Sequence, residues 1–260
     1  MPCIFPLEIE ETILDLLAED DEGHSALKTC SLVCQAFLPI CRKHIFGSIV
    51  LNEYKVPSSP TTHEFDRLLL ETPEIADYIR KLDYNVRIPD FTSPSIRKSL
   101  KRISRLEFLT VRCHSSIEKL NWTYEPICPA LLHLLHLPTL THFKMIGIND
   151  FVLSDLIPCV NLKYLDIGVD TTTAAETTFH AALPEHPIQL REFVLSGTGF
   201  RNPSTIMKLY SARRPDGRPI IDFGSLSKIT VTVDNLDESE VLQELFRRCH
   251  ALTNACISCR

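Results

Sequence analysis

The sequence predicts an α/β protein in which a compact helical block precedes an irregular solenoid of alternating strands and helices. Three observations support this fold class. Apolar residues recur at helical spacing over roughly the first 45 residues. A six-residue pattern typical of a short, half-buried strand returns seven times after residue 79. Helix-like stretches separate most of these strands.

The first helix is expected from Pro6 onward. Proline suits the first turn of a helix, where its missing N–H is not needed. The glutamates at positions 8, 10 and 11 favour the positive end of the helix dipole. Apolar side chains at helical spacing then form one face: Ile9, Ile13, Leu16 and Leu17.

Further short helices are expected up to about residue 45. Gly23 ends the acidic stretch EDDEG, Ser25 caps the next helix and Pro39 marks a break within the following run. The segment IFGSIVL predicts a strand. So short a block buries little apolar surface by itself, so it needs something to pack on.

The residues of this block resemble the F-box of the fungal F-box-like families. The segments FPLEIEETILDLL and ALKTCSLVCQAFLPICRKHIF carry a Pro-x-Glu-Ile opening, a Ser-Leu-Val-Cys junction and an aromatic residue after a basic pair. The resemblance covers residues 4–52. Phe5 replaces a leucine and Phe37 a common tryptophan, and both keep a large apolar group.

The resemblance implies a helical module that docks on a Skp-type adaptor, which links it to a cullin–RING ubiquitin ligase. The adaptor-binding residues that it implies are Phe5, Pro6, Leu7, Ile9, Ile13, Leu32 and Val33. The structural alternative is that these helices only cap the domain that follows.

The recurring pattern has apolar residues at its first, fourth and sixth positions. It begins at Ile79, Leu106, Leu140, Leu162, Leu190, Leu226 and Leu252. This period predicts an α/β solenoid of leucine-rich-repeat type, with insertions in the longer gaps such as SARRPDGRPIIDFGS. The alternative is a generic α/β domain with scattered leucines.

The predicted domains are an F-box-like helical domain over 1–52, a helical linker over 53–78 and a leucine-rich-repeat-like solenoid over 79–260. The linker segment FDRLLLETPEIADYIRKL resembles the segment that joins the F-box to the first repeat in fungal F-box proteins. Alternate strand residues face outward. The expected target-binding residues on this concave face are Phe108, Thr110, Arg112, His142, Lys144, Tyr164, Asp166, Glu192 and Lys228.

Composition narrows the possible partners and compartments. The net charge of −6 argues against a nucleic-acid binder. No apolar run approaches the roughly 20 residues of a membrane span, and the acidic N-terminus lacks a signal peptide's basic region. We expect an intracellular protein, cytoplasmic or nuclear, whose ten cysteines are reduced.

Three residue clusters have the residue types of a metal site, and we interpret them as structural. They are Cys249 and His250 with Cys256 and Cys259; Cys30, Cys34 and Cys41 with His24 and His44; and His133 and His136 with His142. The stretch GTGFRNPS lacks the third glycine of a dinucleotide fingerprint. With no phosphate-binding loop and no nucleophile elbow, the sequence predicts no enzyme, no catalytic residue, no metal and no cofactor.

The expected function is therefore that of a non-catalytic substrate receptor of a Skp/cullin/F-box-type ubiquitin ligase. The N-terminal helices would bind the adaptor, and the repeat region would bind an unknown target protein. The alternative is a leucine-rich-repeat interaction scaffold without a link to a ubiquitin ligase. The last strand-like segment, residues 252–260, is expected to be exposed and to favour self-association.

Overall fold

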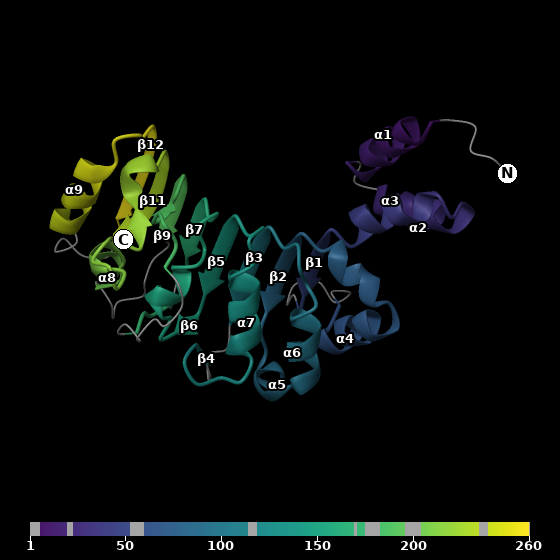
Figure 1. Cartoon of the computed structure of the whole chain (residues 1–260), viewed down its shortest axis with the longest axis horizontal. Helices are drawn as coiled ribbons and strands as arrows, with labels where there is room; N and C mark the ends of the chain where they lie inside the picture. Colours follow the sequence, from purple (N-terminus) through teal and green to yellow (C-terminus); the bar gives the residue numbers. More distant parts are fainter. Residues whose placement is uncertain are drawn as a thin grey trace.

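The structure is a computed structural model. It describes residues 6–19, 23–52, 60–113, 119–168, 171–174, 183–195, 204–233 and 239–259. Figure 1 shows helices at the N-terminus, followed by a long sheet with further helices along one side of it.

Three helices form the N-terminal module: α1 (Leu7–Ala18), α2 (Gly23–Val33) and α3 (Phe37–Ile45). They share a small core of their own that consists of Leu14, Leu27, Ile40 and Cys41. His44 Nε2 lies 2.7 Å from Asp15 Oδ1 and ties α3 to α1. Arg42 forms an ion pair with Glu74 at 3.3 Å, which connects α3 to the segment that leads into the second strand of the sheet.

Eight parallel strands form the main sheet, and their order in space follows their order in the chain. They are β1 (Ser48–Leu51), β2 (Lys81–Asn85), β3 (Phe108–Arg112), β5 (His142–Ile146), β7 (Tyr164–Ile167), β9 (Glu192–Leu195), β11 (Lys228–Val233) and β12 (Asn254–Cys259). Each strand begins at or just after the third position of the apolar pattern, except β1, which lies in the segment IFGSIVL.

One face of the sheet is buried because apolar residues alternate along each strand. In β3, Leu109 and Val111 are buried, whereas Phe108, Thr110 and Arg112 are half-exposed. The register stacks the buried residues in rows, and one row consists of Leu82, Leu109, Phe143, Leu165, Phe193 and Ile229. These rows belong to one continuous apolar core that also includes helix residues.

The connections between strands differ from one another. The helices after β1 are α4 (Thr62–Glu71), α5 (Ile88–Thr92), α6 (Pro94–Leu100), α7 (Cys128–Leu135), α8 (Ser204–Ser211) and α9 (Ser239–Arg248). Short 3₁₀ turns occur at η1 (Pro73–Asp77), η2 (Leu153–Leu156) and η3 (Phe223–Ser225). Two small parallel sheets pair β4 (Leu120–Asn121) with β6 (Ile148–Asn149) and β8 (Ile188–Gln189) with β10 (Ile221–Asp222).

The predicted fold class is wrong. A helical module followed by an irregular leucine-rich-repeat-like solenoid of about seven strands was expected. The structure instead has one eight-stranded, all-parallel sheet in an α/β fold. The six-residue pattern detects strands that are buried on one face, but it carries no information on the connections. Those connections do not form one recurring unit.

All-parallel sheets are shared by Rossmann-like and other α/β folds. Here the strand order never reverses within the main sheet. The crevice that a reversal creates at the carboxyl ends of the strands, where doubly wound folds bind ligands, is therefore not formed by this sheet. In the parts of the chain that the structure covers, no helix is long and apolar enough to cross a membrane.

A buried polar network joins the end of β1 to the end of β2. Asn52 has a left-handed backbone conformation with φ +59° and is 2% exposed. Its Nδ2 donates to Asn85 O and to Asp90 Oδ2, each at 3.1 Å. Asn85 Nδ2 donates back to Asn52 O at 3.0 Å, and Thr62 Oγ1 donates to Asp90 Oδ1 at 2.8 Å. The network fixes the start of α4 and α5 against the sheet.

Candidate functional site

The N-terminal module exposes large apolar side chains. Ile9 and Ile13 are 46% and 53% exposed on α1, and Leu16 on the same helix is 63% exposed. Leu32 and Val33, at the end of α2, are 88% and 74% exposed. On α1 the three residues follow the i, i+4, i+7 spacing of one helix face. The module therefore has an inner apolar core and a second, uncovered set of apolar residues, which we call the N-terminal apolar face.

The predicted adaptor-binding residues fall on this face where the structure describes their side chains. Pro6 is exposed at the start of α1, and the exposed Ile9, Ile13, Leu32 and Val33 belong to the face. Leu7 lies in α1, but its side chain is outside what the structure describes, and Phe5 is outside the described residues. Leu16 was omitted from the prediction, although its helical spacing from Ile9 and Ile13 was the signal for it.

The second candidate surface is the face of the main sheet opposite the apolar core, here called the open face. All nine predicted target-binding residues lie on its strands, and the register brings them into two rows and part of a third. Phe108, His142, Tyr164, Glu192 and Lys228 are consecutive in the first row. Thr110, Lys144 and Asp166 form part of the second row, and Arg112 lies in a third between Asn85 and Ile146.

Three aromatic rings stack along the first row. The rings of Phe108 and His142 have centroids 4.1 Å apart, and those of His142 and Tyr164 are 5.4 Å apart. Lys81 Nζ lies 4.8 Å from the Phe108 centroid on the outer side of the stack. The neighbouring rings bury the imidazole, and this burial lowers the pKa of His142 despite the opposing effect of Glu192. His142 is therefore neutral near pH 7.

Ion pairs tie carboxylates on the open face to cations on neighbouring strands. Asp83 pairs with Arg112, Asp166 with Lys144, and Glu192 with Lys228, each at 2.5 Å. Asp166 is 2% exposed and also accepts from Tyr164 Oη at 3.3 Å.

Tyr164 remains a phenol at neutral pH. Burial, reinforced by the negative charge of Asp166, raises its pKa to about 12. The hydroxyl therefore keeps its proton and can donate a hydrogen bond to the Asp166 carboxylate.

The residues just before the strands line the edge of the sheet at which the strands begin, here called the rim. Arg80 and Glu107 pair across it at 3.7 Å. Lys163 and Arg191 are rim neighbours, since Arg191 N donates to Lys163 O at 2.8 Å. The prediction omitted these two cations. Their place at the second position of LKYLDI and LREFVL was the available signal.

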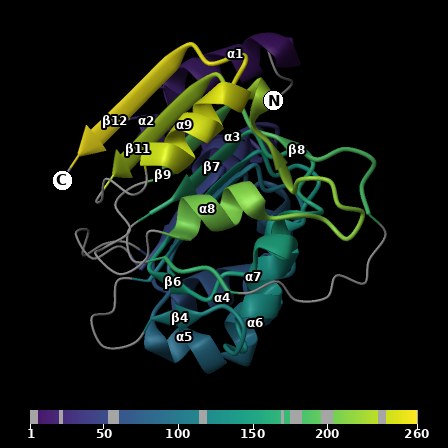
Figure 2. The same cartoon turned by 90° about the vertical axis from the view of Figure 1, so that its left-hand side faces the viewer.

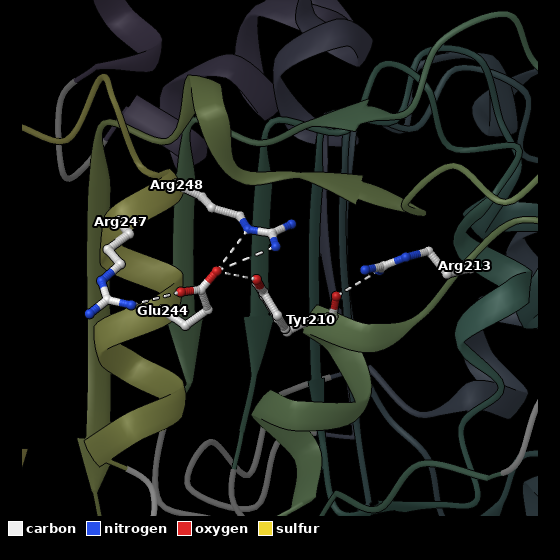
Figure 3. A network of polar contacts seen from close by, with 5 residues as sticks. All are labelled: Tyr210, Arg213, Glu244, Arg247 and Arg248. Carbon is white, nitrogen blue, oxygen red and sulfur yellow. Dashed lines mark hydrogen bonds and ion pairs between the residues drawn. The ribbon is translucent and has the colours of Figure 1, made fainter.

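The residues of a polar cluster between α8 and α9 contact mainly one another (Figure 3). Tyr210 Oη donates to Glu244 Oε1 at 3.0 Å, and the Arg248 guanidinium lies 4.7 Å from the Tyr210 ring centroid. Arg247 bonds Glu244 at 3.3 Å, and Arg213 Nη1 donates to Tyr210 O at 2.8 Å. The cluster therefore joins two helices that both lie beside the last strands (Figure 2).

The residues considered as metal ligands differ in their surroundings, although Cys30 packs against the small core that contains Cys41. Cys41 is buried in the N-terminal core, Cys249 is buried under the sheet and Cys256 is exposed. His136 Nε2 lies 2.8 Å from Asp155 O, while His142 belongs to the ring stack. Within the described ranges, no group of three or more His, Cys, Asp or Glu residues could hold a metal ion. The side chains of His24 and Cys259 lie outside what the structure describes.

Comparisons with protein-family models and with curated protein sequences find no match for this chain.

Proposed function

We propose that this chain is a non-catalytic substrate receptor of a Skp/cullin/F-box-type ubiquitin ligase. Its N-terminal helices dock on a Skp-type adaptor, and its open face holds a target protein. The partner subunits transfer the ubiquitin, so this chain positions the target protein and catalyses no step itself.

The observation that carries the proposal is the N-terminal apolar face. A module this small retains only a few residues for its own core, yet five large apolar side chains remain exposed on α1 and α2. Ile9, Ile13 and Leu16 share one side of α1, and such groups of exposed apolar residues are typical of protein-binding surfaces. The F-box resemblance supports the choice of partner, because the residues that it implies for adaptor binding include four of these five.

Matched isoleucine substitutions test the proposal. Ile9 and Ile88 are both 46% exposed, and both lie in the first turn of a helix, α1 and α5. An aspartate is tolerated at either position because it favours the helix dipole. Ile9→Asp places a charge on the apolar face, whereas Ile88→Asp places the same charge on a distant helix.

Binding of each purified variant to an immobilised Skp-type adaptor is measured by surface plasmon resonance. We expect wild type and Ile88→Asp to bind equally, and Ile9→Asp to bind at least tenfold more weakly, about 1.4 kcal/mol. Failure of the wild-type chain to bind the adaptor would rule the proposal out, as would equal binding of both variants.

A further inference from the structure

The charge of the open face is opposite in sign to that of the whole chain. Together with its rim, the face carries seven basic side chains in the described residues: Arg80, Lys81, Arg112, Lys144, Lys163, Arg191 and Lys228. It carries four acidic ones: Asp83, Glu107, Asp166 and Glu192. The excess of three positive charges sits on a chain whose net charge is −6. An excess that opposes the overall charge marks a surface that attracts an acidic partner.

The pairing pattern shows which of the cations are available to such a partner. Each of the four carboxylates is within 4.0 Å of a cation: Arg112, Arg80, Lys144 or Lys228. The remaining three, Lys81, Lys163 and Arg191, have no carboxylate partner among the described residues. Lys81 and Arg191 are exposed and Lys163 is half-exposed. Within the ranges that the structure describes, no carboxylate neutralises their charge.

These three cations flank the stacked rings. Lys81 lies over Phe108 at one end of the stack, on β2. Lys163 directly precedes Tyr164 at the other end, and Arg191 precedes the next strand, β9. From β2 to β9 the sheet advances four strand spacings, or about 19 Å. An extended peptide of about six residues covers this span.

We infer that the open face binds an extended, acidic segment of the target protein, laid across the strands over the Phe108–His142–Tyr164 stack. Carboxylates of that segment pair with Lys81 at one end and with Lys163 and Arg191 at the other. The rings supply the apolar contact between them. This inference deepens the target-binding half of the proposed function and needs no adaptor.

Fluorescence anisotropy with defined peptides tests the inference on the full chain. The probe is a fluorescein-labelled eight-residue peptide of alternating glutamate and alanine, compared with its glutamine and lysine counterparts. We expect the glutamate peptide to bind at least tenfold more tightly than either counterpart, and its binding to weaken as salt is added. Equal binding of the glutamate and glutamine peptides would overturn the inference.

Paired substitutions localise the site. Lys163→Gln with Arg191→Gln should weaken glutamate-peptide binding at least tenfold. Lys98→Gln with Lys101→Gln removes two exposed lysines at α6 on the helical side and should leave it unchanged. If both double variants bind the glutamate peptide equally well, the peptide does not bind at the open face and the inference is overturned. A single-stranded oligonucleotide of equal charge that binds more tightly than the peptide would also overturn the inference, in favour of a nucleic-acid partner.

The same proteins separate this inference from the proposed function. The Lys163→Gln, Arg191→Gln variant should bind the Skp-type adaptor as wild type does, because its changes lie away from the N-terminal apolar face. A chain that binds the glutamate peptide but not the adaptor would contradict the ligase link and support the acidic site. A chain that binds the adaptor but shows no preference for the glutamate peptide would support the ligase link and contradict the acidic site.

Discussion

The imidazole of His142 stacks on the phenyl ring of Phe108, with centroids 4.1 Å apart and an interplanar angle of 24°. The two residues are direct partners in the register of β3 and β5. The stack is possible because both side chains leave the same face of the sheet, where no apolar core covers them. The stack continues to Tyr164 and gives the open face a strip of three rings beside its charged residues.

The stack predicts a pH dependence of stability. Burial lowers the folded-state pKa of His142 below the ordinary histidine value of 6.5. Between the two pKa values the unfolded chain binds more protons, so the unfolding free energy rises with pH. As the pH falls from about 6.5 toward the folded-state pKa of His142, the unfolding free energy should therefore decrease. Below that pKa the effect of His142 on the unfolding free energy should stay constant.

Urea unfolding of wild type and His142→Gln between pH 5 and 8 measures this contribution. The difference between the two should change with pH, whereas the exposed His133→Gln should track wild type. An NMR titration midpoint of His142 at or above 6.5 would contradict the prediction.

Leu165 lies at the centre of the buried row and is fully buried. Leu165→Ala should lower the unfolding free energy by about 2–5 kcal/mol, through lost burial and the cavity that remains. Leu70→Ala on α4 is the matched control, because Leu70 is 62% exposed. We expect its effect to stay within about 0.5 kcal/mol. Denaturant unfolding gives both values, and an unchanged midpoint for Leu165→Ala would contradict the burial.

Asn52 combines a left-handed backbone with two buried hydrogen bonds. Asn52→Ala should lower the unfolding free energy in two ways. Alanine is strained in the left-handed conformation, which costs roughly 1–2 kcal/mol, and the buried groups that Asn52 bonds are left unpaired, which costs about 1–3 kcal/mol. Asn52→Gly loses only the hydrogen bonds, because glycine adopts this conformation freely. Thermal unfolding should therefore rank wild type above Asn52→Gly and Asn52→Gly above Asn52→Ala. The opposite order of the two variants would argue against the left-handed conformation.

The cysteines should differ in reactivity. Cys256 is exposed, whereas Cys128 and Cys159 are buried. Burial raises the pKa of Cys128 to about 12 and that of Cys159 well above its usual range, so both remain thiols at neutral pH. Brief alkylation with iodoacetamide at pH 7.5, read by mass spectrometry, should modify Cys256 before Cys128 and Cys159. Equal rates at Cys128 and Cys256 in the native protein would contradict this arrangement.

The apolar pattern predicted strands well and connections poorly. A strand of the main sheet begins within every one of its seven occurrences, since alternating burial is a local property of the sequence. Helix-like stretches were expected between most of the strands, but the segment DFVLSDLIPCV between β5 and β7 contains only the 3₁₀ turn η2. Pro158 follows closely and disfavours continued helix. The two-residue strands β4, β6, β8 and β10 are too short to leave a periodic signal.

For the two candidate surfaces, too, the sequence predicted only part of what the structure shows. Periodicity grouped Ile9, Ile13 and Leu16 on one side of a helix, but it could not say that this side faces away from the module's core. Alternation placed the open-face residues correctly relative to one another. Which cations keep a carboxylate partner depends on cross-strand register, so the difference between Lys144 and Lys163 is visible only in three dimensions.

We propose that the chain binds two partners through separate surfaces, and hydrogen–deuterium exchange of the chain with and without a Skp-type adaptor distinguishes the two. The adaptor should slow exchange in α1 and in the last turn of α2, and leave β3, β5 and β7 unchanged. Slower exchange confined to these strands, or no change in α1 and α2 at saturating adaptor, would contradict it.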